Sequence, residues 1–219
     1  VVGIITPWNF PVAIPSWKIL PALVAGNTVV FKPATDTPYC AYRFVEILQE
    51  AGLPPGVINF VTGSGSRVGN PIIEDPRVRL ISITGSSFTG RKVAGRCGEL
   101  MKKISCELGG KNAICVMDDA KLELAVDGAL WGAFGTTGQR CTATSRVILH
   151  KDIYEKFVDM FVKRAKELKV GDGLDPSVDV GPVINKDQLK SINEYVKIGQ
   201  DEGAKLLFGG KILDKGDHA

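Results

Sequence analysis

The sequence predicts an α/β protein built on a parallel sheet with helices on both faces. Val- and Ile-rich runs alternate along the chain with segments whose apolar residues recur at helical spacing. The apolar runs are continuous rather than interleaved with polar residues, which is typical of strands buried on both faces. The alternation pauses at Gly109-Gly110 and then restarts. We therefore expect two units, one at 1–109 and one at 110–219.

In the first unit, each apolar run leads into a helical segment. Strands are expected at 1–6, 27–33, 58–63, 78–85 and 102–110. Helices are expected at 12–26 and 37–52, in a short segment that ends near Glu74, and from about Thr89 to Met101. The helix at 37–52 should stop at Gly52, because glycine commonly ends helices and Pro54-Pro55 does not continue one.

The second unit repeats this pattern around a loop of small and polar residues. The predicted elements are, in order, a strand (113–119), a helix (122–134), the loop, a strand (146–150), a helix (153–169), a Gly/Asp/Pro-rich loop (171–182), a further helix and a strand (204–210). Strands and helices again alternate, so the α/β class is expected to extend over the whole chain.

Composition argues against several classes of function. The chain has 219 residues, of which 44% are hydrophobic and 23% charged, and it can therefore bury a core. Its formal net charge of +3 is small and charges of both signs are interleaved, so we expect no nucleic-acid partner. No apolar run approaches the ~18 residues that span a bilayer, so we expect no membrane association.

The five cysteines are isolated from one another and from histidine. They form no CxxC pair, and the only histidines are His150 and His218. This pattern argues against a metal site and indicates a reducing compartment, so we expect a cytoplasmic protein. Four cysteines lie within helix or strand patterns and are interpreted as buried packing residues: Cys40, Cys97, Cys106 and Cys115.

Two glycine clusters follow predicted strands and are candidates for binding phosphate. GSGSRVG (63–69) is the more conspicuous, but its Gly-x-Gly-x-x-x-Gly spacing departs from the dinucleotide fingerprint, and a turn with tight helix packing explains it equally well. In ITGSSFTG (83–90) a strand ends at Gly85-Ser86 and a helix follows. Free backbone N–H groups and the positive end of the helix dipole suit a pyrophosphate there.

Lys32 ends the second predicted strand, at the edge where parallel sheets bind ligands. A lone lysine at such a position is most often simply solvated. Its interest comes from sharing this edge with Trp8-Asn9 and Gly85-Ser86.

Glu107 is an acid on an otherwise apolar strand. A carboxylate there is costly unless it is paired, hydrated or functional. The structural alternative to a functional role is a salt bridge to Lys111 or Arg140.

Cys141 differs from the other cysteines because it lies in a loop. Gly135 and Gly138 precede it and would let a substrate approach, and the adjacent Arg140 can favour the thiolate, which is the reactive form. No histidine is near in sequence, so any general base must be a carboxylate such as Glu107. Cys141 is therefore a candidate nucleophile.

Five motifs resemble those of the aldehyde dehydrogenase superfamily. They occur in the family's order: TPWNFP (6–11), FKPATDTP (31–38), ITGSSFTG (83–90), ELGGK (107–111) and GQRCTATSR (138–146). The resemblance covers essentially the whole chain and looks closest to the branch that oxidises 2,5-dioxopentanoate (α-ketoglutaric semialdehyde) or succinic semialdehyde. It implies part of a Rossmann-like NAD(P)-binding domain at 1–109 and the N-terminal part of an α/β catalytic domain at 110–219.

Family members are roughly twice as long, and this chain begins without Met inside a strand-like run. We therefore interpret it as a piece from the middle of a longer protein, active only as part of the full length. The resemblance also implies a homodimer or homotetramer when the protein is complete.

The resemblance assigns roles to matching residues. Cys141 would be the nucleophile and Glu107 the base that activates water, while the Asn9 side-chain amide and the Cys141 backbone N–H would form an oxyanion hole. The implied NAD(P)-binding residues are Thr6, Trp8, Lys32, Thr35, Gly65, Gly85, Ser86, Gly90 and Leu108. Under this assignment the GSGSRVG cluster becomes secondary, with Gly65 near the adenosine at most.

The implied reaction is the oxidation of an aldehyde to a carboxylic acid by NAD or NADP, through a cysteine thiohemiacetal and a thioester. Thr35 replaces the glutamate common in NAD-specific relatives, so NADP is expected to be accepted. Arg140 is expected either to recognise a distal carboxylate of the substrate or to form a structural salt bridge. Two alternatives stay open: a relative that transfers the acyl group to CoA, and a non-catalytic structural relative.

Overall fold

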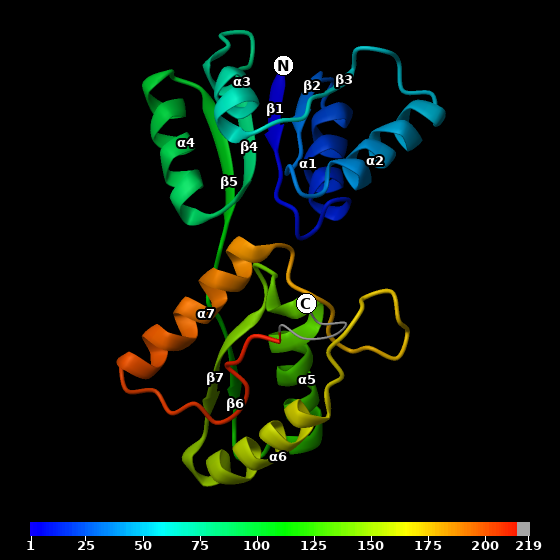
Figure 1. The fold of residues 1–219 in the computed structure, drawn as a ribbon. Coiled ribbons are helices and arrows are strands. Elements are labelled where there is room, and N and C mark those ends of the chain that lie inside the picture. Colours follow the sequence, from blue (N-terminus) through cyan, green and yellow to red (C-terminus); the bar gives the residue numbers. More distant parts are fainter. Residues whose placement is uncertain (214–219) are drawn as a thin grey trace. The chain divides into compact units, whose positions relative to one another are not determined.

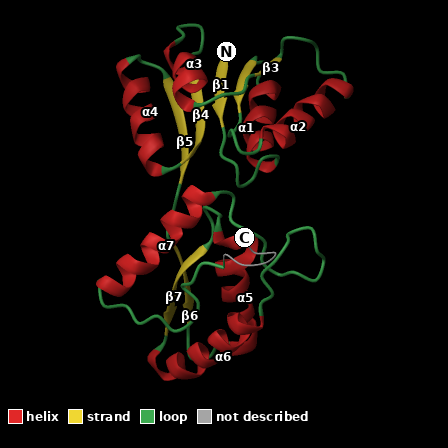
Figure 2. Cartoon of the chain, in the orientation of Figure 1, coloured by secondary structure: helices red, strands yellow, loops and turns green. Residues whose placement is uncertain are grey.

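Two compact units, Val1–Gly109 and Gly110–Ala219, make up the chain, and the computed structural model describes residues 1–213 (Figure 1). Each unit is an α/β arrangement of its own (Figure 2). Among the described residues, no helix combines the length and apolar character needed to cross a membrane.

The sheet of the first unit contains five parallel strands in the order β3-β2-β1-β4-β5. The strands are β1 (Val2–Ile5), β2 (Val29–Lys32), β3 (Ile58–Phe60), β4 (Leu80–Gly85) and β5 (Lys103–Leu108). The predicted parallel α/β class is confirmed, and each of these strands lies within a range expected from the sequence.

Four α-helices cover the sheet of the first unit: α1 (Ala13–Val24), α2 (Pro38–Glu50), α3 (Asn70–Glu74) and α4 (Ser87–Glu99). Ile19 of α1 and Val45 of α2 share a core with Ile4 of β1. Ile72 of α3 and Val93 of α4 share a second core with Ile81 of β4. Because successive strand residues face opposite sides, β1 and β4 contribute to both cores, and the continuous apolar runs follow from this burial.

Glycine positions explain two features of this layer. A Cβ on Gly3 of β1 would lie 2.7 Å from Ile72 Cγ2, so α3 can cross β1 only over a residue without a side chain. Gly52 adopts φ 92°, and its N–H binds the carbonyl of Gln49 at 2.9 Å. The predicted stop of α2 at Gly52 is therefore confirmed as a left-handed C-terminal cap.

In its described residues, 110–213, the second unit contains a two-stranded parallel sheet and three α-helices. The elements are β6 (Asn112–Val116), α5 (Leu122–Phe134), β7 (Thr144–Leu149), α6 (Tyr154–Glu167) and α7 (Lys186–Asp201). Val126 and Ala129 of α5 pack with Phe157 of α6 and Val116 of β6 in a single core. Asn112 pairs with Thr144 but Ala113 pairs with Arg146, so β7 carries a bulge at Ser145.

The predicted strand at 204–210 is wrong. This segment has no regular secondary structure, and Leu206, Leu207 and Phe208 are 44–52% exposed. Gly209 and Gly210 adopt φ values of 77° and 69°, outside the extended region, and no strand among the described residues pairs with the segment. The run of apolar residues suggested a strand, but a strand also needs a hydrogen-bonding neighbour.

Two of the cysteines interpreted as buried are exposed. Cys97, on the buried face of α4, is fully buried, and Cys106 is partly buried, as expected. Cys40 and Cys115 are exposed, because Cys40 lies in the first turn of α2 and Cys115 lies on a face of β6 that no described element buries. Their helix and strand patterns alone did not specify which face is covered.

Candidate functional site

The carboxyl ends of β1, β2 and β4 form one edge of the first unit's sheet. The chain builds outward from β1 to β2 and β3, then returns to place β4 on the other side of β1. The point between β1 and β4, where the strand order reverses, is the usual ligand-binding position in such sheets. Thr6, Lys32 and Gly85 lie at the ends of these three adjacent strands.

Lys32 is 6% exposed and holds its ammonium group at this edge. Its Nζ donates to the carbonyl of Pro33 at 2.8 Å and to the carbonyl of Gly63 at 3.1 Å. Burial lowers the pKa of Lys32, and no acid within the described residues pairs with it. Two of its three N–H donors are used, so the third is available to an acceptor such as a sugar hydroxyl.

Thr6 follows the neighbouring strand β1 and contacts the main chain of Lys32. Its backbone N–H donates to the carbonyl of Lys32 at 3.2 Å, and its Oγ1 is buried without a hydrogen-bond partner among the described residues. A buried hydroxyl usually has a partner, so an orphaned one at a sheet edge fits a bound polar ligand.

Helix α4 begins at this edge with Ser86 as its N-cap. The Ser86 hydroxyl accepts from the Thr89 N–H at 3.1 Å and donates to Thr89 Oγ1 at 2.9 Å. The N–H groups of Ser87 and Phe88, in the first turn, have no acceptor within the helix and point out with the positive end of its dipole. A Cβ on Gly85 would meet no atom within 4 Å, so there is space for a ligand.

Gly90 and Leu108 contact each other within this unit. The Gly90 N–H donates to the carbonyl of Ser86 at 2.9 Å, and a Cβ on Gly90 would lie 2.3 Å from Leu108 Cδ2. Gly90 therefore lets α4 pack closely against β5, and its N–H is already used in a hydrogen bond within the helix. The role of Gly90 and Leu108 in binding a cofactor remains a prediction.

The GSGSRVG cluster forms a turn after β3. Gly63 adopts φ 145°, and Ser64 caps a π-helical turn at Gly65–Gly69 by accepting from the Arg67 N–H at 3.3 Å. A Cβ on Gly65 would meet no atom within 4 Å. The turn is connected to the edge through the bond between Lys32 and the Gly63 carbonyl.

The remaining predicted residues of this edge follow β1 and β2. Trp8 and Asn9 lie in the segment after β1, and both are partly buried. Thr35 is exposed in a turn after β2, beside Asp36. The side chain of Thr35 is thus accessible to solvent, three residues beyond Lys32 in the chain.

Glu107 lies on the exposed face of β5, while Cys106 and Leu108 face the α4 side. No residue of Val1–Gly109 forms an ion pair with it. Sequence reasoning missed a charge that interacts with this carboxylate within the unit, the ammonium group of Lys18 in α1. The Lys18 Nζ donates to Ser82 Oγ at 2.9 Å, and burial lowers the pKa of Lys18 while the charge of Glu107 opposes that shift.

The helical pattern of this segment did not indicate that Lys18 is partly buried, because a single lysine on an amphipathic helix normally faces solvent. The available signal was Ser82, a polar residue in the middle of a buried strand. A polar side chain in such a place usually has a partner on the element that covers it.

Cys141 lies in the second unit, exposed, in a turn between α5 and β7. The Ala143 N–H donates to the carbonyl of Arg140 at 3.1 Å and closes this turn. The Cys141 carbonyl accepts from Asn112 Nδ2 at 2.7 Å. Its backbone N–H binds no acceptor within the described part of the chain.

The loop before Cys141 has strained backbone. Thr136 and Thr137 adopt φ values of 53° and 56°, and a Cβ on Gly138 would lie 2.6 Å from the carbonyl of Ala133. Non-glycine residues in the left-handed region cost about 1–3 kcal/mol each and persist only where surrounding contacts enforce them. Such strain commonly accompanies functional loops.

Arg140 turns its side chain back onto the end of α5. Its Nη2 donates to the carbonyls of Trp131 at 2.7 Å and Gly132 at 3.1 Å, and its guanidinium lies 5.1 Å from the centre of the Trp131 ring. These contacts hold the guanidinium at the end of α5, and Arg140 Nε is buried without a hydrogen-bond partner among the described residues. Both expected roles of Arg140 remain predictions.

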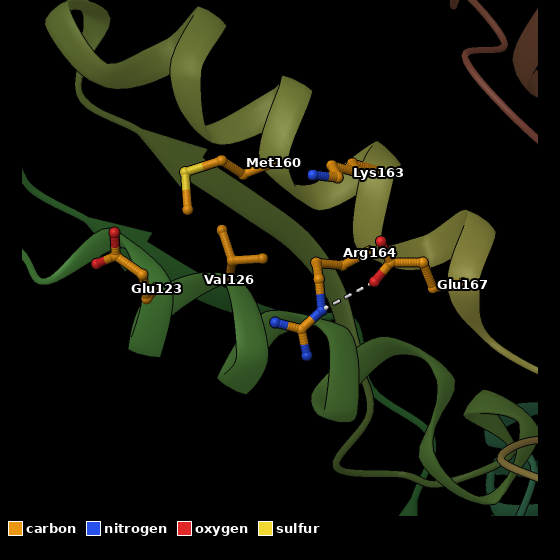
Figure 3. A pocket seen from close by; sticks show the side chains of 6 residues that line it. All are labelled: Glu123, Val126, Met160, Lys163, Arg164 and Glu167. Atoms are coloured by element: carbon orange, nitrogen blue, oxygen red, sulfur yellow. Dashed lines mark ion pairs between the residues drawn. The ribbon is translucent and has the colours of Figure 1, made fainter.

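Other clusters lie apart from these residues. The α5–α6 groove of about 450 Å³ is lined by Glu123, Val126, Met160, Lys163, Arg164 and Glu167 and contains none of the predicted residues (Figure 3). Asp118, His150 and Asp152 have ligand atoms within 4.8 Å of one another and form the one group in the described residues that could hold a metal ion. All three are at least partly exposed, and the expectation of no metal remains a prediction.

Comparisons with known proteins agree with this arrangement. The family model for the aldehyde dehydrogenase family matches residues 1–219. The 2,5-dioxopentanoate dehydrogenase of Saccharolobus solfataricus is 49% identical over 215 residues, which are 97% of this chain and 45% of that protein. The alpha-ketoglutaric semialdehyde dehydrogenase of Bacillus subtilis is 48% identical over 218 residues, which are 100% of this chain and 45% of that protein.

A solved structure supports the fold in detail. Betaine aldehyde dehydrogenase from Staphylococcus aureus in complex with NAD⁺ has a TM-score of 0.95 and 40% identity, with 99% of this chain and 43% of that chain covered. The chain thus spans less than half the length of the relatives it matches. Because the family model and these relatives cover nearly all of its residues, the chain belongs to the aldehyde dehydrogenase family.

Proposed function

We propose that the complete protein oxidises an aldehyde to a carboxylic acid with NAD or NADP. The observation that carries the proposal is the turn at Cys141, where one residue has an exposed thiol and a backbone N–H with no acceptor among the described residues. A nucleophile and an oxyanion donor are the two groups that acyl chemistry at a carbonyl requires. Family membership supports the same reaction.

The proposed reaction starts with the thiolate of Cys141. Its sulfur forms a bond to the aldehyde carbon, and the resulting oxyanion is stabilised by the Cys141 N–H and the side-chain amide of Asn9, donors that need no change of protonation. Loss of the carbon-bound hydrogen as hydride leaves a thioester on Cys141. Glu107 then removes a proton from a water molecule that attacks the thioester, and the acid leaves as the thiol is restored.

The bound cofactor supplies the hydride acceptor. The edge of the first unit's sheet fits a dinucleotide, because it presents a free ammonium N–H, an orphaned hydroxyl and the N-terminus of α4 next to open space. We assign Lys32 and Thr35 to the adenosine ribose, and Ser86 with the first turn of α4 to the pyrophosphate. Trp8 would contact the pyrophosphate together with Ser86, Thr6 would line the same edge, and Gly65 would lie near the adenosine at most.

We propose a semialdehyde that carries a carboxylate as the substrate class. The proposal rests on two of the relatives described above, the 2,5-dioxopentanoate dehydrogenase and the alpha-ketoglutaric semialdehyde dehydrogenase. The contacts of Arg140 do not add to it, since its guanidinium is engaged with α5. The residue that would bind the distal carboxylate is therefore not assigned.

We further propose that the complete protein is cytoplasmic and assembles as a homodimer or homotetramer. Exposed apolar side chains on α1, such as Trp17 and Val24 at 66% and 90% exposure, support burial against further protein. Size-exclusion chromatography with light scattering tests the assembly.

Replacing Cys141 with serine tests the function. The variant should bind NADP as the wild type does but lose dehydrogenase activity, because an unactivated hydroxyl is a far weaker nucleophile than a thiolate. Cys40→Ser is the matched control, since Cys40 is also exposed, and it should stay active. Retained activity in Cys141→Ser would remove the basis of the assignment.

The same assay separates hydrolysis from transfer to CoA. With Glu107 present as a base, product formation should not depend on added CoA. A requirement for CoA, with acyl-CoA as the product, would identify the acylating alternative instead.

A further inference from the structure

Asn112 begins β6 and reaches the main chain of the nucleophile. Its Nδ2 donates to the Cys141 carbonyl at 2.7 Å and lies 3.4 Å from the Ala143 carbonyl. The bulge at Ser145 shifts the register of β7 immediately beside this contact. Bulges change the direction of side chains next to active sites. Here the bulge lies beside the contact between the amide of Asn112 and the turn of Cys141.

Two peptide planes flank the Cα of Cys141, and each is held by a separate bond. The Arg140–Cys141 plane is held because the Arg140 carbonyl accepts from the Ala143 N–H at 3.1 Å. In a trans peptide the N–H points opposite to the carbonyl, so this bond directs the Cys141 N–H away from the turn. The Cys141–Thr142 plane is held by Asn112.

Arg140 supplies the third point of attachment. Its Nη2 bonds to the last carbonyls of α5, where the negative end of the helix dipole favours a cation, and these bonds fix the turn relative to the helix. With both planes and the preceding residue held, the direction of the free Cys141 N–H has little freedom.

We infer that Asn112 is a positioning residue for the reaction at Cys141. By holding the Cys141 carbonyl, its side chain keeps the Cys141 N–H aimed as an oxyanion donor. The inference rests on the proposed function, in which Cys141 is the nucleophile. It adds a residue that touches neither the substrate nor the cofactor and acts through the main chain of Cys141.

Two reactions of the same thiol distinguish positioning from general structure. Acylation by p-nitrophenyl acetate forms a bond from sulfur to the ester carbonyl carbon through an oxyanion and expels p-nitrophenolate. Alkylation by iodoacetamide displaces iodide from a CH₂ group and forms no oxyanion. An N–H that is misdirected should therefore slow the first reaction and not the second.

Asn112→Ala and Asn112→Asp test this in the complete protein without cofactor. Loss of an oxyanion donor costs about 10²–10³ in rate, and a donor that is only misaligned should cost about 10-fold or more. We expect that loss in the saturating acylation rate, with little change in the ester concentration for half-saturation. Alkylation at Cys141, followed by mass spectrometry, should proceed at the wild-type rate.

Asn112→Asp keeps the shape of the side chain but turns a donor into an acceptor that faces a carbonyl oxygen. It should acylate no faster than Asn112→Ala, and it serves as the informative variant if the alanine variant is unstable. Asn27→Ala is the control, because the Asn27 amide also donates to backbone carbonyls, at Ala22 and Ala25 in the first unit. It should leave both rates unchanged.

The outcomes separate the inference from the proposed function. If the wild type is not acylated at Cys141, the proposed function fails. If the wild type is acylated and both Asn112 variants match it, the positioning role is wrong. An equal fall of acylation and alkylation would also overturn it, since Asn112 would then only maintain the fold around the thiol.

Discussion

Lys18 of α1 donates a hydrogen bond to Ser82 of β4 at 2.9 Å, across the face of the sheet that α1 covers. Burial lowers the pKa of Lys18 below its ordinary value of 10.5, and the negative charge of Glu107 on the neighbouring strand partly restores it. A cation on a covering helix is therefore coupled to the proposed general base within one unit. The coupling has a measurable pH dependence.

As the pH rises toward 10.5, we expect the free energy of unfolding of the wild type to increase relative to that of Lys18→Met. The folded-state pKa is lowered, so between the two pKa values the unfolded chain binds more protons and stability increases with pH. Urea unfolding of both proteins at neutral pH and near pH 10 measures the difference. Lys103→Met, at an exposed position of β5, should show no comparable trend.

Adding Glu107→Gln should steepen that dependence. Without the negative charge of Glu107, nothing from that residue offsets the effect of burial, so the pKa of Lys18 falls further. The pH range over which stability rises then becomes wider. An unchanged pH dependence in the Glu107→Gln background would show that the two side chains are not coupled.

Glu107→Gln should also slow one step of the catalytic cycle, deacylation, without slowing the steps before it. Acylation and hydride transfer need no base at this position, whereas deacylation loses general-base catalysis worth about 10²–10⁴ in rate. Rapid mixing should show a burst of NAD(P)H followed by a slow steady state. Glu50→Gln at the end of α2 is the control, and a burst that falls together with the steady rate would place Glu107 earlier in the reaction.

Thr35→Glu should weaken the use of NADP much more than that of NAD. The exposed threonine near Lys32 can donate to a 2′-phosphate, and charge-assisted contacts of about 1.5–3 kcal/mol are available there, whereas a glutamate would repel it. kcat/KM for both cofactors in both proteins measures the change. Asp36→Asn is the companion variant, and strict NAD use by the wild type would contradict the prediction.

Gly90→Ala should destabilise the protein by about 1 kcal/mol. Its Cβ would lie 2.3 Å from Leu108 Cδ2, and overpacking costs about 1–3 kcal/mol, which exceeds the ~1 kcal/mol gained in helix propensity. Gly95→Ala on the same helix meets no atom within 4 Å and should be stabilising. In a Leu108→Ala background the cost of Gly90→Ala should disappear, and thermal unfolding of the double-mutant cycle checks this.

The sequence determined the order of the elements and the parallel class, because continuous apolar runs are what strands buried on two faces require. It also singled out Cys141 as a candidate nucleophile, because its glycine-flanked loop differs from the patterns around the other cysteines. Lys32 and Ser86 followed from the rule that ligands bind where parallel strands end. These inferences depend on local spacing, which the chain carries in its own order.

The tertiary structure decided which partner each side chain has. Lys18 meets Ser82, Gly90 meets Leu108, and Asn112 meets the Cys141 carbonyl, 64, 18 and 29 residues apart in the chain. Residues 204–210 lack a strand neighbour, and Arg140 binds the end of α5 rather than an acid. Local patterns specify how a segment can fold, but a hydrogen bond or a packing contact between distant segments exists only once the sheet and its helices bring them together.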